Sequence, residues 1–403
     1  MSCPACGGRP AGLVLRQERV PVLQNRVWPT LEQALQAPTG TLALTWCARC
    51  DHIWNAAFDP DAELYDPSYD NRQDASPAFR DYLSERMEAL AEHVAPGDTI
   101  VEIGCGQGAF LEALCARAGT TGRGFDPSFR GGATADGVHI EASYYGAAQA
   151  GVPADLVVGR HVIEHVPDVF GLLHGVHAAL SERPDATVVF ECPDMTWILQ
   201  HHVVWDLFYE HVHYFSPTSL RAAFHRAGFE VVEHVPVFEG QYQWLVARPG
   251  ALVPLKVTSG RLGPQIRMMV AAQAAWLTQL REQLEGARVA LWGAGAKGTT
   301  LARLVDPHAE HLVGIVDLNP AKQGGFVGGT GHRVIAPAEL PGLDVDEVWV
   351  MNPAYAAEIS AQVRRDDLRV RVRLAPPPRS ASCSPCSPSA SPPATAPGTS
   401  SAA

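Results

Sequence analysis

The sequence predicts an α/β protein with a mostly parallel, doubly wound sheet, followed by a second, smaller α/β unit. Apolar strand-like runs alternate with helical segments from Ser76 to about Leu374, which is typical of such sheets. A glycine-rich turn follows the first strand of each unit, at 104–108 and at 293–298. Four cysteines within the first 50 residues indicate a small module ahead of both units.

The overall composition excludes several classes of protein. A hydrophobic fraction of 46% and a charged fraction of 18% are ordinary for a folded chain of 403 residues and exclude disorder throughout. The net charge of −12 argues against a general nucleic-acid binder, which needs a basic face. No apolar run approaches the roughly 20 residues that span a bilayer, and the N-terminus lacks a signal-peptide pattern. We therefore expect a cytoplasmic protein whose cysteines are thiols or metal ligands.

The first α/β unit begins with a helix at Ser76-Pro77, where serine is a suitable N-cap and proline a suitable first helical residue. A strand at 99–103 precedes the first glycine-rich turn, and a helix starts at about Ala109. A second capped helix opens at Ser216-Pro217. The remaining strands of this unit are expected at 122–126, 137–141, 155–158, 186–191, 231–237 and 243–246.

The second unit follows an alanine-rich amphipathic helix at 264–284, which we interpret as a connector. The expected domains are a zinc-binding module at 1–60, a first α/β domain at 61–250, a connecting segment at 251–284, a Rossmann-like domain at 285–374 and a disordered tail at 375–403. The tail is almost entirely Pro, Ser, Ala and Thr, so it has little to bury. Strands of the second unit are expected at 288–292, 312–317, 347–351 and 368–374.

The N-terminal cysteines form two Cys-x-x-Cys pairs, Cys3 with Cys6 and Cys47 with Cys50. Each pair presents two thiolates at a spacing that suits zinc, and two pairs complete the tetrahedron of a structural site. Because four thiolates leave no open coordination position, we expect structural rather than catalytic zinc. Four unrelated thiols or a redox pair are the alternatives, although a redox pair usually opens a helix after a strand.

The first glycine-rich turn has the form Gly-x-Gly-x-Gly, at Gly104, Gly106 and Gly108, and Glu102 precedes it by two residues. Asp126 ends the next predicted strand, where an acid can hold ribose hydroxyls. This pattern resembles the first motif of class I S-adenosylmethionine (SAM) methyltransferases. The resemblance implies SAM over the three glycines with its ribose on Asp126. A turn needed only for packing and a nicotinamide dehydrogenase are the alternatives, but the third glycine is misplaced for a dehydrogenase.

Longer strings extend the resemblance to one family. Gly-Arg-His-Val-Ile-Glu-His-Val-Pro-Asp stands at 159–168, Phe-Glu-Cys-Pro-Asp at 190–194 and Phe-Tyr-Glu-His-Val-His-Tyr-Phe-Ser at 208–216. With the cysteine pairs and the turn at 293–298, their order resembles the three-domain nucleotide-sugar C-methyltransferases. These enzymes join a zinc-binding domain, a SAM domain and a C-terminal Rossmann-like domain. The resemblance covers residues 1–374.

The resemblance implies methylation of a carbon next to a keto group on a nucleotide-linked deoxysugar. The proton α to the carbonyl must leave first, and the resulting enolate then attacks the SAM methyl group. Such a reaction needs a general base, stabilisation of the enolate oxygen and alignment of the reactants. The resemblance implies His211 as the base, because the histidine pKa lies near working pH. It also implies Glu210 as a carboxylate that orients the base or binds sugar, and Tyr69 as a hydrogen-bond donor.

Two further residues, Arg160 and His161, follow the fourth predicted strand at the carboxyl edge of the sheet, where α/β ligands bind. We expect them to line the SAM or sugar pocket, and the alternative is that they cap the sheet edge. His213 is a second candidate for the base. A metal cluster of the histidines between 201 and 213 also stays open, although C-methylation of an acidic carbon does not require one.

The second glycine-rich turn fits Gly-x-Gly-x-x-Gly at Gly293, Gly295 and Gly298, and Asp317 ends the next strand. In isolation this pattern would indicate a dinucleotide site and an NAD-linked oxidoreductase. The family resemblance implies instead a domain that helps hold substrate or forms a wall of the active site. A methyltransferase for another small carbonyl or hydroxyl substrate and a non-enzymatic zinc-bearing scaffold are further alternatives. We expect a monomer or weak oligomer that binds a nucleotide-linked keto-sugar, with no nucleic-acid or membrane partner.

Overall fold

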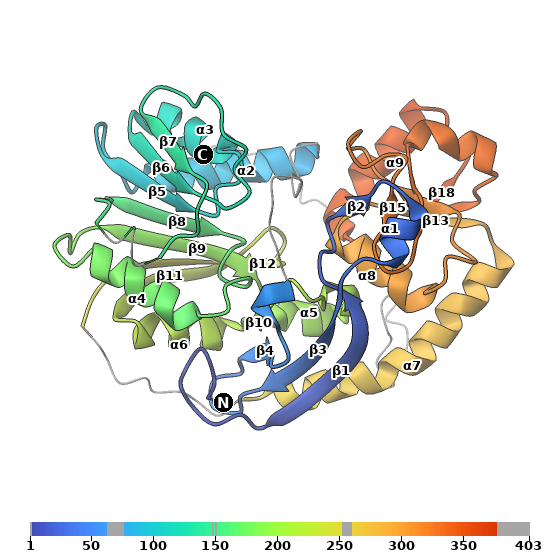
Figure 1. The fold of residues 1–403 in the computed structure, drawn as a ribbon, viewed down its shortest axis with the longest axis horizontal. Helices are drawn as coiled ribbons and strands as arrows, with labels where there is room; N and C mark the ends of the chain where they lie inside the picture. Colours follow the sequence, from blue (N-terminus) through green and yellow to red (C-terminus); the bar gives the residue numbers. More distant parts are fainter. Residues whose placement is uncertain (1, 63–75, 147–148, 150, 252–259, 377–403) are drawn as a thin grey trace, which may run out of the picture.

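The structure is a computed structural model that describes residues 2–62, 76–146, 149, 151–251 and 260–376. Figure 1 shows two α/β units side by side, with the N-terminal segment and the long helix α7 beneath and between them. Two sequence predictions, the role of Tyr69 and the disordered tail, concern residues that lie outside these ranges, apart from Ala375 and Pro376 of the tail.

A seven-stranded sheet in the order β11-β12-β9-β8-β5-β6-β7 forms the centre of the first unit. The strands from β9 to β7 are parallel, whereas β12 runs antiparallel to both β9 and β11. This arrangement confirms the predicted doubly wound sheet with a closing pair of strands. The strands are β5 (Thr99–Ile103), β6 (Thr121–Phe125), β7 (Val138–Glu141), β8 (Leu156–Arg160), β9 (Thr187–Pro193), β11 (Phe229–Val237) and β12 (Tyr242–Pro249).

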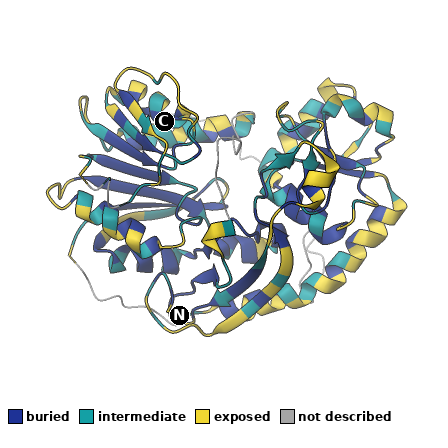
Figure 2. Ribbon diagram, in the orientation of Figure 1, coloured by how far each residue is buried: buried dark blue, intermediate teal, exposed yellow. Residues whose placement is uncertain are grey.

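The helices of this unit begin where the sequence signals indicate. Ser76 accepts a hydrogen bond from the Phe79 amide at the start of α2, and Ser216 forms a capping box with Ser219 at the start of α6. Apolar side chains such as Leu111 pack against the sheet, whose central strands are almost fully buried (Figure 2). The helices are α2 (Pro77–Ala91), α3 (Ala109–Ala118), α4 (Val169–Ala179), α5 (Met195–His201) and α6 (Pro217–Arg226), and a 3₁₀ turn, η3, spans Val204–Asp206.

The N-terminal segment contributes to two further sheets that also contain later segments. The first has the order β1-β3-β4-β10, from β1 (Gly12–Pro21), β3 (Thr39–Trp46), β4 (Ile53–Asn55) and β10 (His213–Tyr214). In the second, β2 (Val27–Trp28) pairs antiparallel with β15 (Phe326–Val327) of the C-terminal unit. Helix α1 (Leu31–Leu35) and the 3₁₀ turn η1 (Pro60–Ala62) complete this part. The N-terminal segment is therefore in contact with both α/β units.

The C-terminal unit contains a parallel five-stranded sheet in the order β16-β14-β13-β17-β18. Helix α8 follows the second glycine-rich turn, and α9 follows the short helix η5 (Pro353–Tyr355). This alternation confirms the predicted second α/β unit. Its elements are β13 (Val289–Trp292), α8 (Ala296–Val305), β14 (Gly314–Val316), β16 (Val334–Ile335), η4 (Pro337–Leu343), β17 (Glu347–Val350), α9 (Ala356–Arg365) and β18 (Arg371–Leu374).

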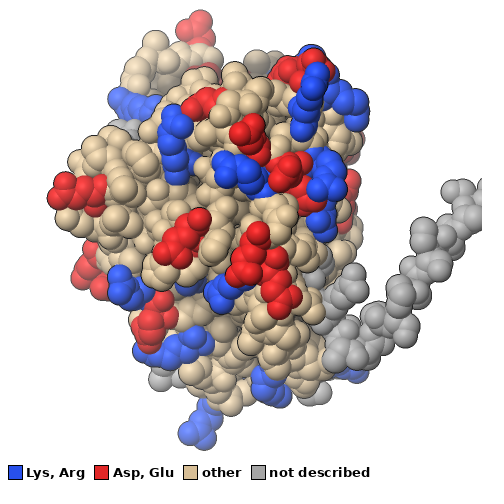
Figure 3. Space-filling model, turned by 90° about the vertical axis from the view of Figure 1, so that its right-hand side faces the viewer, with Lys and Arg blue, Asp and Glu red and all other residues tan. Residues whose placement is uncertain are grey.

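The predicted connecting helix is α7 (Leu262–Gly286), and it packs against β1, α5 and α8. One face buries apolar side chains such as Ile266, Trp276 and Leu284, while the opposite face is exposed (Figure 2). The helix therefore holds the three parts together as well as linking two of them. In the described residues, none of the helices has the length and apolar character that crossing a membrane requires. Figure 3 shows acidic and basic side chains intermixed on the face it presents.

Candidate active site

A cavity of about 300 Å³ lies between the two α/β units. The first unit contributes the loop after β8 and the loop before β10, and the C-terminal unit contributes the glycine-rich turn between β13 and α8. The cavity lies at the carboxyl ends of β8 and β13, where ligands of α/β proteins usually bind. Its walls include His161, Glu164, His165, Glu210 and His211 on one side, and Gly293, Gly295, Lys297, Asp317 and Asn319 on the other.

The first glycine-rich turn connects β5 to α3 and has a backbone that only glycine adopts readily. Gly104 and Gly108 have φ angles of 71° and 89°. A Cβ atom added at Gly104 would lie only 2.0 Å from the Val162 side chain. A Cβ atom added at Gly106 would have no described atom within 4 Å. One side of the turn is thus tightly packed, and the backbone at Gly106 can be approached closely by a ligand.

Asp126 lies at the end of β6 and contacts this turn directly. Its carboxylate accepts hydrogen bonds from the Gly106 amide at 2.8 Å and from the Ser128 amide and hydroxyl at 2.8 and 2.6 Å. The carboxylate therefore orients the turn and stands beside its open side. Glu102 is buried beneath the turn, and burial raises its pKa to about 7 although Arg160 opposes this shift.

A buried network around Glu191 connects this turn to the cavity. Glu191, at the end of β9, is fully buried and accepts a hydrogen bond from the Tyr82 hydroxyl at 2.8 Å. Its carboxylate also pairs with His161 Nε2 at 2.8 Å and with Arg160 Nε at 3.6 Å. Burial alone would raise the pKa of Glu191, but Arg160 and His161 lower it to about 2. The network is thus held together by ionised groups.

His161 is held in an unusual conformation within this network. Its φ is 51°, in the left-handed region that non-glycine residues seldom adopt, and its amide donates to the Glu191 carbonyl at 2.9 Å. Burial would lower the pKa of His161, but its bonds to Glu164 and Glu191 raise it to about 9. His161 therefore carries a positive charge at the cavity wall near neutral pH.

The predicted Tyr-Glu-His string follows η3 and leads into β10. Glu210 is fully buried, and its carboxylate accepts hydrogen bonds from the backbone amides of Gln24 and Asn25 in the N-terminal segment. Tyr209 packs against Phe58, with ring centroids 5.2 Å apart. The string is therefore anchored from behind by the N-terminal segment, while Glu210 and His211 border the cavity.

His211 lies in an apolar setting at the cavity wall. Its ring is 4.0 Å from that of Phe208 and meets the ring of His165 edge-to-face at 4.9 Å. Burial, followed by the neighbouring His165 and His161, lowers the pKa of His211 well below its usual value. Ligand atoms of Glu164, His165 and His211 lie within 4.8 Å of one another, so these groups can act on one substrate moiety. His211 is thus a neutral imidazole in the resting protein.

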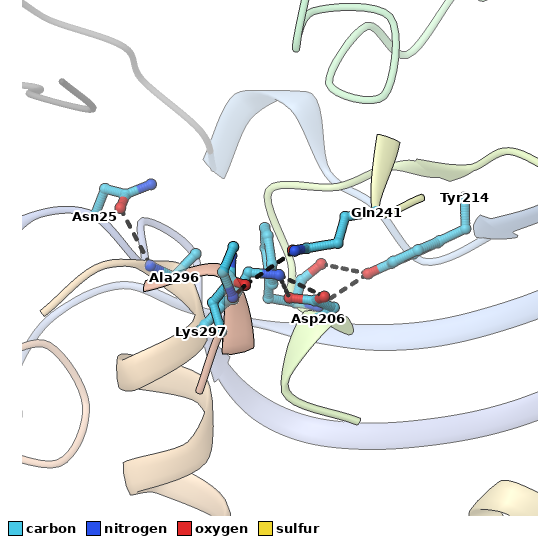
Figure 4. A network of polar contacts seen from close by, with 9 residues as sticks. Asn25, Asp206, Tyr214, Gln241, Ala296 and Lys297 are labelled. Atoms are coloured by element: carbon cyan, nitrogen blue, oxygen red, sulfur yellow. Dashed lines mark hydrogen bonds and ion pairs between the residues drawn. The ribbon is translucent and has the colours of Figure 1, made fainter. Parts of the chain in front are cut away.

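The second glycine-rich turn shares one contact with the first, an aspartate after the next strand that accepts from a turn amide. Asp317 accepts hydrogen bonds from the Ala294 and Asn319 amides, both at 2.8 Å. The N-terminus of α8, however, already has a partner, because the Asn25 side-chain oxygen accepts from the Ala296 amide at 3.2 Å (Figure 4). The site where a dinucleotide pyrophosphate would bind is therefore capped by a side chain of the N-terminal segment.

Polar contacts join the units across the cavity, among them those of Lys297 and Gln241 (Figure 4). Lys297 Nζ contacts both carboxylate oxygens of Asp206, at 2.5 and 2.6 Å. The Gln241 side-chain amide donates to Asn352 Oδ1 at 3.0 Å. Asp206 is buried and Lys297 partly exposed, so the ion pair keeps a cation at the cavity wall.

The four N-terminal cysteines converge at one point. Cys3 Sγ lies 3.7 Å from Cys50 Sγ, and Cys6 Sγ lies 3.7 Å from Cys47 Sγ. Zinc–sulfur bonds of about 2.3 Å in a tetrahedron separate the sulfur atoms by about 3.8 Å. The residues present therefore fit a tetrathiolate zinc ion.

Several residues of the site had no assigned role in the sequence interpretation. Glu191 belongs to a quoted string and ends a strand, which is the signal that could have indicated it. Lys297 lies within the second glycine-rich turn, which is a signal of the same kind, whereas Asn25 and Asp206 carry none because their partners are distant in sequence. Arg160 is the last residue of β8 and His161 follows it, at the carboxyl edge of the sheet, and Glu191 pairs with both. The four predicted zinc ligands lie in the cysteine cluster, and the predicted glycines lie in the two glycine-rich turns.

Comparisons with known proteins agree with this geometry. A methyltransferase domain family matches residues 72–234, and a C-methyltransferase C-terminal domain family matches residues 262–368. The C-methyltransferase NovU of Streptomyces niveus is 28% identical over 295 residues, which cover 65% of this chain and 68% of NovU.

Solved structures resemble this chain only in part. The cyclopropane synthase MmaA2 of Mycobacterium tuberculosis is 15% identical, with a TM-score of 0.33 over 44% of this chain and 70% of MmaA2. A SAM-dependent methyltransferase of Mesorhizobium loti is 19% identical, with a TM-score of 0.31 over 41% of this chain and 99% of that protein. The family matches and the sheet order together make this chain a SAM-dependent methyltransferase of the class I fold.

Proposed function

We propose that this SAM-dependent methyltransferase methylates a carbon atom next to a keto group of a nucleotide-linked deoxysugar. The observation that carries the proposal is the neutral His211 at the wall of a cavity between the methyltransferase unit and a C-methyltransferase C-terminal domain. Oxygen and nitrogen nucleophiles carry lone pairs, whereas carbon α to a carbonyl becomes nucleophilic only after deprotonation. A buried neutral base therefore suits a carbon nucleophile.

His211 is the proposed general base. It takes the α proton of the substrate, and the electron pair of that C–H bond becomes the enolate. SAM supplies the methyl group, which the enolate carbon attacks while the C–S electron pair leaves with sulfur. Burial lowers the pKa of His211, so its lone pair is free at neutral pH, although the same shift makes it a weaker base than an exposed histidine. Glu210 is buried behind the base and fixes the loop that carries it.

The negative charge of the enolate needs a partner at the cavity wall. The His161 imidazolium stands there, and its own charge is balanced from behind by Glu164 and Glu191. Because both ring nitrogens are paired with these carboxylates, we assign to it stabilisation of the enolate through its charge rather than through a hydrogen bond. Tyr69 remains a proposed hydrogen-bond donor on the basis of the sequence, since it lies outside the described residues.

The C-terminal unit is the proposed holder of the nucleotide. Lys297 and Lys322 both border the cavity, and their side chains, rather than the N-terminus of α8 that Asn25 caps, would contact a diphosphate. In the first unit, at the glycine-rich turn rather than in the lining of the cavity, the backbone at Gly106 and the carboxylate of Asp126 fit SAM and its ribose. The two reactants would then approach each other from opposite units, as methyl transfer in line with sulfur requires.

An NAD-linked oxidoreductase is the rival proposal that the second glycine-rich turn raises. Asn25 at the α8 N-terminus argues against it, because its side-chain oxygen stands where a pyrophosphate would accept hydrogen bonds. A ligand that binds only the folded state raises the melting temperature. We expect SAM to raise it and NAD to leave it unchanged. Stabilisation by NAD would favour the rival.

We also propose one structural zinc ion per chain, bound by Cys3, Cys6, Cys47 and Cys50. The four sulfur atoms have the spacing that the ion requires. Structural zinc contributes directly to folding. Metal analysis of freshly purified protein should therefore find one zinc, and Cys47→Ser should lower both the zinc content and the melting temperature. Purified protein without zinc would contradict the assignment.

The proposed reaction is tested by product analysis. The protein is incubated with SAM and a panel of nucleotide-linked keto-sugars, and the product is examined by mass spectrometry and NMR. We expect a mass gain of one methylene and a new methyl group bound to carbon. A methyl group on oxygen, or reaction with only non-sugar carbonyl compounds, would contradict the proposed substrate or nucleophile.

A further inference from the structure

We infer that His52 and His213 form a buried positioning pair that holds the candidate base against the loop after β8. The inference rests on the proposed function for His211, but the pair itself is a feature of the fold. His52 belongs to the N-terminal segment, two residues beyond Cys50, and His213 lies two residues beyond His211. Both side chains are almost completely buried, with exposed fractions of 0% and 1%.

The hydrogen bonds of the pair determine which nitrogen atoms carry protons. His213 Nε2 lies 3.1 Å from the Val166 carbonyl and 3.4 Å from the Pro167 carbonyl. Carbonyl oxygens only accept, so Nε2 of His213 carries hydrogen. Burial lowers the pKa of His213 to about 4, so its Nδ1 holds a lone pair at neutral pH. His52 Nε2, 3.1 Å away, must then donate to that lone pair.

The backbone adds two further hydrogen bonds and a strand pairing at the same place. The His213 amide donates to the Glu164 carbonyl at 3.0 Å, and the Asn55 amide donates to the Val212 carbonyl at 2.8 Å. Residues His213 and Tyr214 also pair with β4. His213 thus joins β4, which follows Cys50, to the Tyr-Glu-His string and to the loop that carries Glu164. Two sides of the active site meet at this one residue.

His213 can affect catalysis because it lies only two residues from His211. His211 and His165 face each other across the cavity wall, and His213 bonds to the loops of both. If the hydrogen bond between His52 and His213 is lost, the two loops are no longer fixed relative to each other. The base then shifts relative to the substrate. A misplacement of about 1 Å can cost roughly 10²-fold in rate. Gly106 and Asp126 are held by their own hydrogen bond within the first glycine-rich turn, so SAM affinity should stay the same even though Val162 of the loop after β8 packs against Gly104.

The decisive variant is His52→Phe, which keeps a ring between Trp54 and Phe215 but removes the donated hydrogen. We expect kcat to fall about 10- to 100-fold with zinc content and SAM affinity unchanged. His213→Gln retains both a donor and an acceptor, so its kcat should fall less than that of His213→Leu, which retains neither. His174→Phe, an exposed histidine of α4 stacked on Phe170, is the matched control and should behave as wild type.

A readout independent of methyl transfer separates this inference from the proposed function. In ¹⁵N-histidine NMR spectra of wild-type protein, His213 should be protonated at Nε2 only, and His52→Phe should shift the signals of His211 and His165. These shifts are expected even if the substrate proves to be something other than a keto-sugar. Unchanged kcat and His211 signals in His52→Phe would overturn the inference, as would a His213 protonated at Nδ1. Simultaneous loss of SAM binding and zinc would also overturn it, because the residue would then be needed for folding in general.

Discussion

The two glycine-rich turns of this protein share one contact, an aspartate that accepts from a turn amide, but differ in backbone conformation and in surroundings. In each, an aspartate at the end of the following strand accepts from a turn amide at 2.8 Å, Asp126 from Gly106 and Asp317 from Ala294. The first turn is open at Gly106, whereas Asn25 caps the helix that follows the second. A glycine-rich turn therefore prepares a site for a ligand, and the segments packed around it determine which ligand can enter.

The largest effect is expected from substitution of His211, which lies at the cavity wall between the two units. His211→Ala should lower methyl transfer by about 10²–10⁴-fold, because the general base is lost. SAM affinity should be nearly unchanged, since the first turn is left intact. Activity is measured as methylated product and SAM affinity by calorimetry.

A solvent-exchange measurement sharpens the interpretation of that variant. Wild-type protein should exchange the substrate α proton with deuterium, and His211→Ala should not, because exchange needs the base but not the methyl donor. Normal exchange in an inactive variant would assign the base to another group. His165 and Tyr69 would then be examined next.

A matched pair of aspartate substitutions tests whether the two turns bind different ligands. Asp126→Ala should weaken SAM binding about ten- to hundredfold, because charge-assisted hydrogen bonds contribute roughly 1.5–3 kcal/mol. Asp317→Ala removes the equivalent carboxylate of the second turn and should raise the KM for the sugar nucleotide without changing SAM affinity. Calorimetry with SAM measures the first effect and steady-state kinetics the second. Equal loss of SAM affinity in both variants would refute the different roles of the turns.

A smaller effect is expected from the ion pair that joins the units. Lys297→Met should raise the KM for the nucleotide-linked substrate about tenfold, because a charge-assisted contact to a phosphate contributes on the order of 1.5 kcal/mol. Asp206→Asn breaks the same pair but leaves the lysine available. If Lys297 binds phosphate, Lys297→Met should therefore be the more harmful of the two. Equal KM values for the two variants would mean that the lysine serves only the ion pair.

The smallest effect concerns the stability of the first unit. The pKa of His161 is raised from 6.5 to about 9 in the folded protein, so its stabilising contribution is complete below pH 6.5. That contribution is lost as pH rises through 9. The free energy of unfolding, measured by denaturant titration, should therefore decrease between pH 6.5 and 9. His161→Gln should flatten this part of the profile, and an unchanged slope would show that His161 is not charged.

Local signals in the sequence predicted most of the elements. The Ser-Pro pairs at 76–77 and 216–217 start helices because capping depends on neighbouring residues alone. The alternation of strands and helices likewise predicted both α/β units. The sequence did not predict that β10 completes the N-terminal sheet or that β2 pairs with β15. Two-residue strands carry almost no periodicity, and their pairing depends on contacts between distant segments.

By itself, the sequence determined the fold class, the two glycine-rich turns, the cysteine pairs and the Tyr-Glu-His string, since each is a pattern of neighbouring residues with a local physical cause. The tertiary structure decided which of these patterns meet. It brought Glu191 to His161, Asn25 to the start of α8 and His52 to His213. These contacts join residues 30 to more than 250 positions apart, and their partners are chosen by the packing of whole elements rather than by any spacing along the chain.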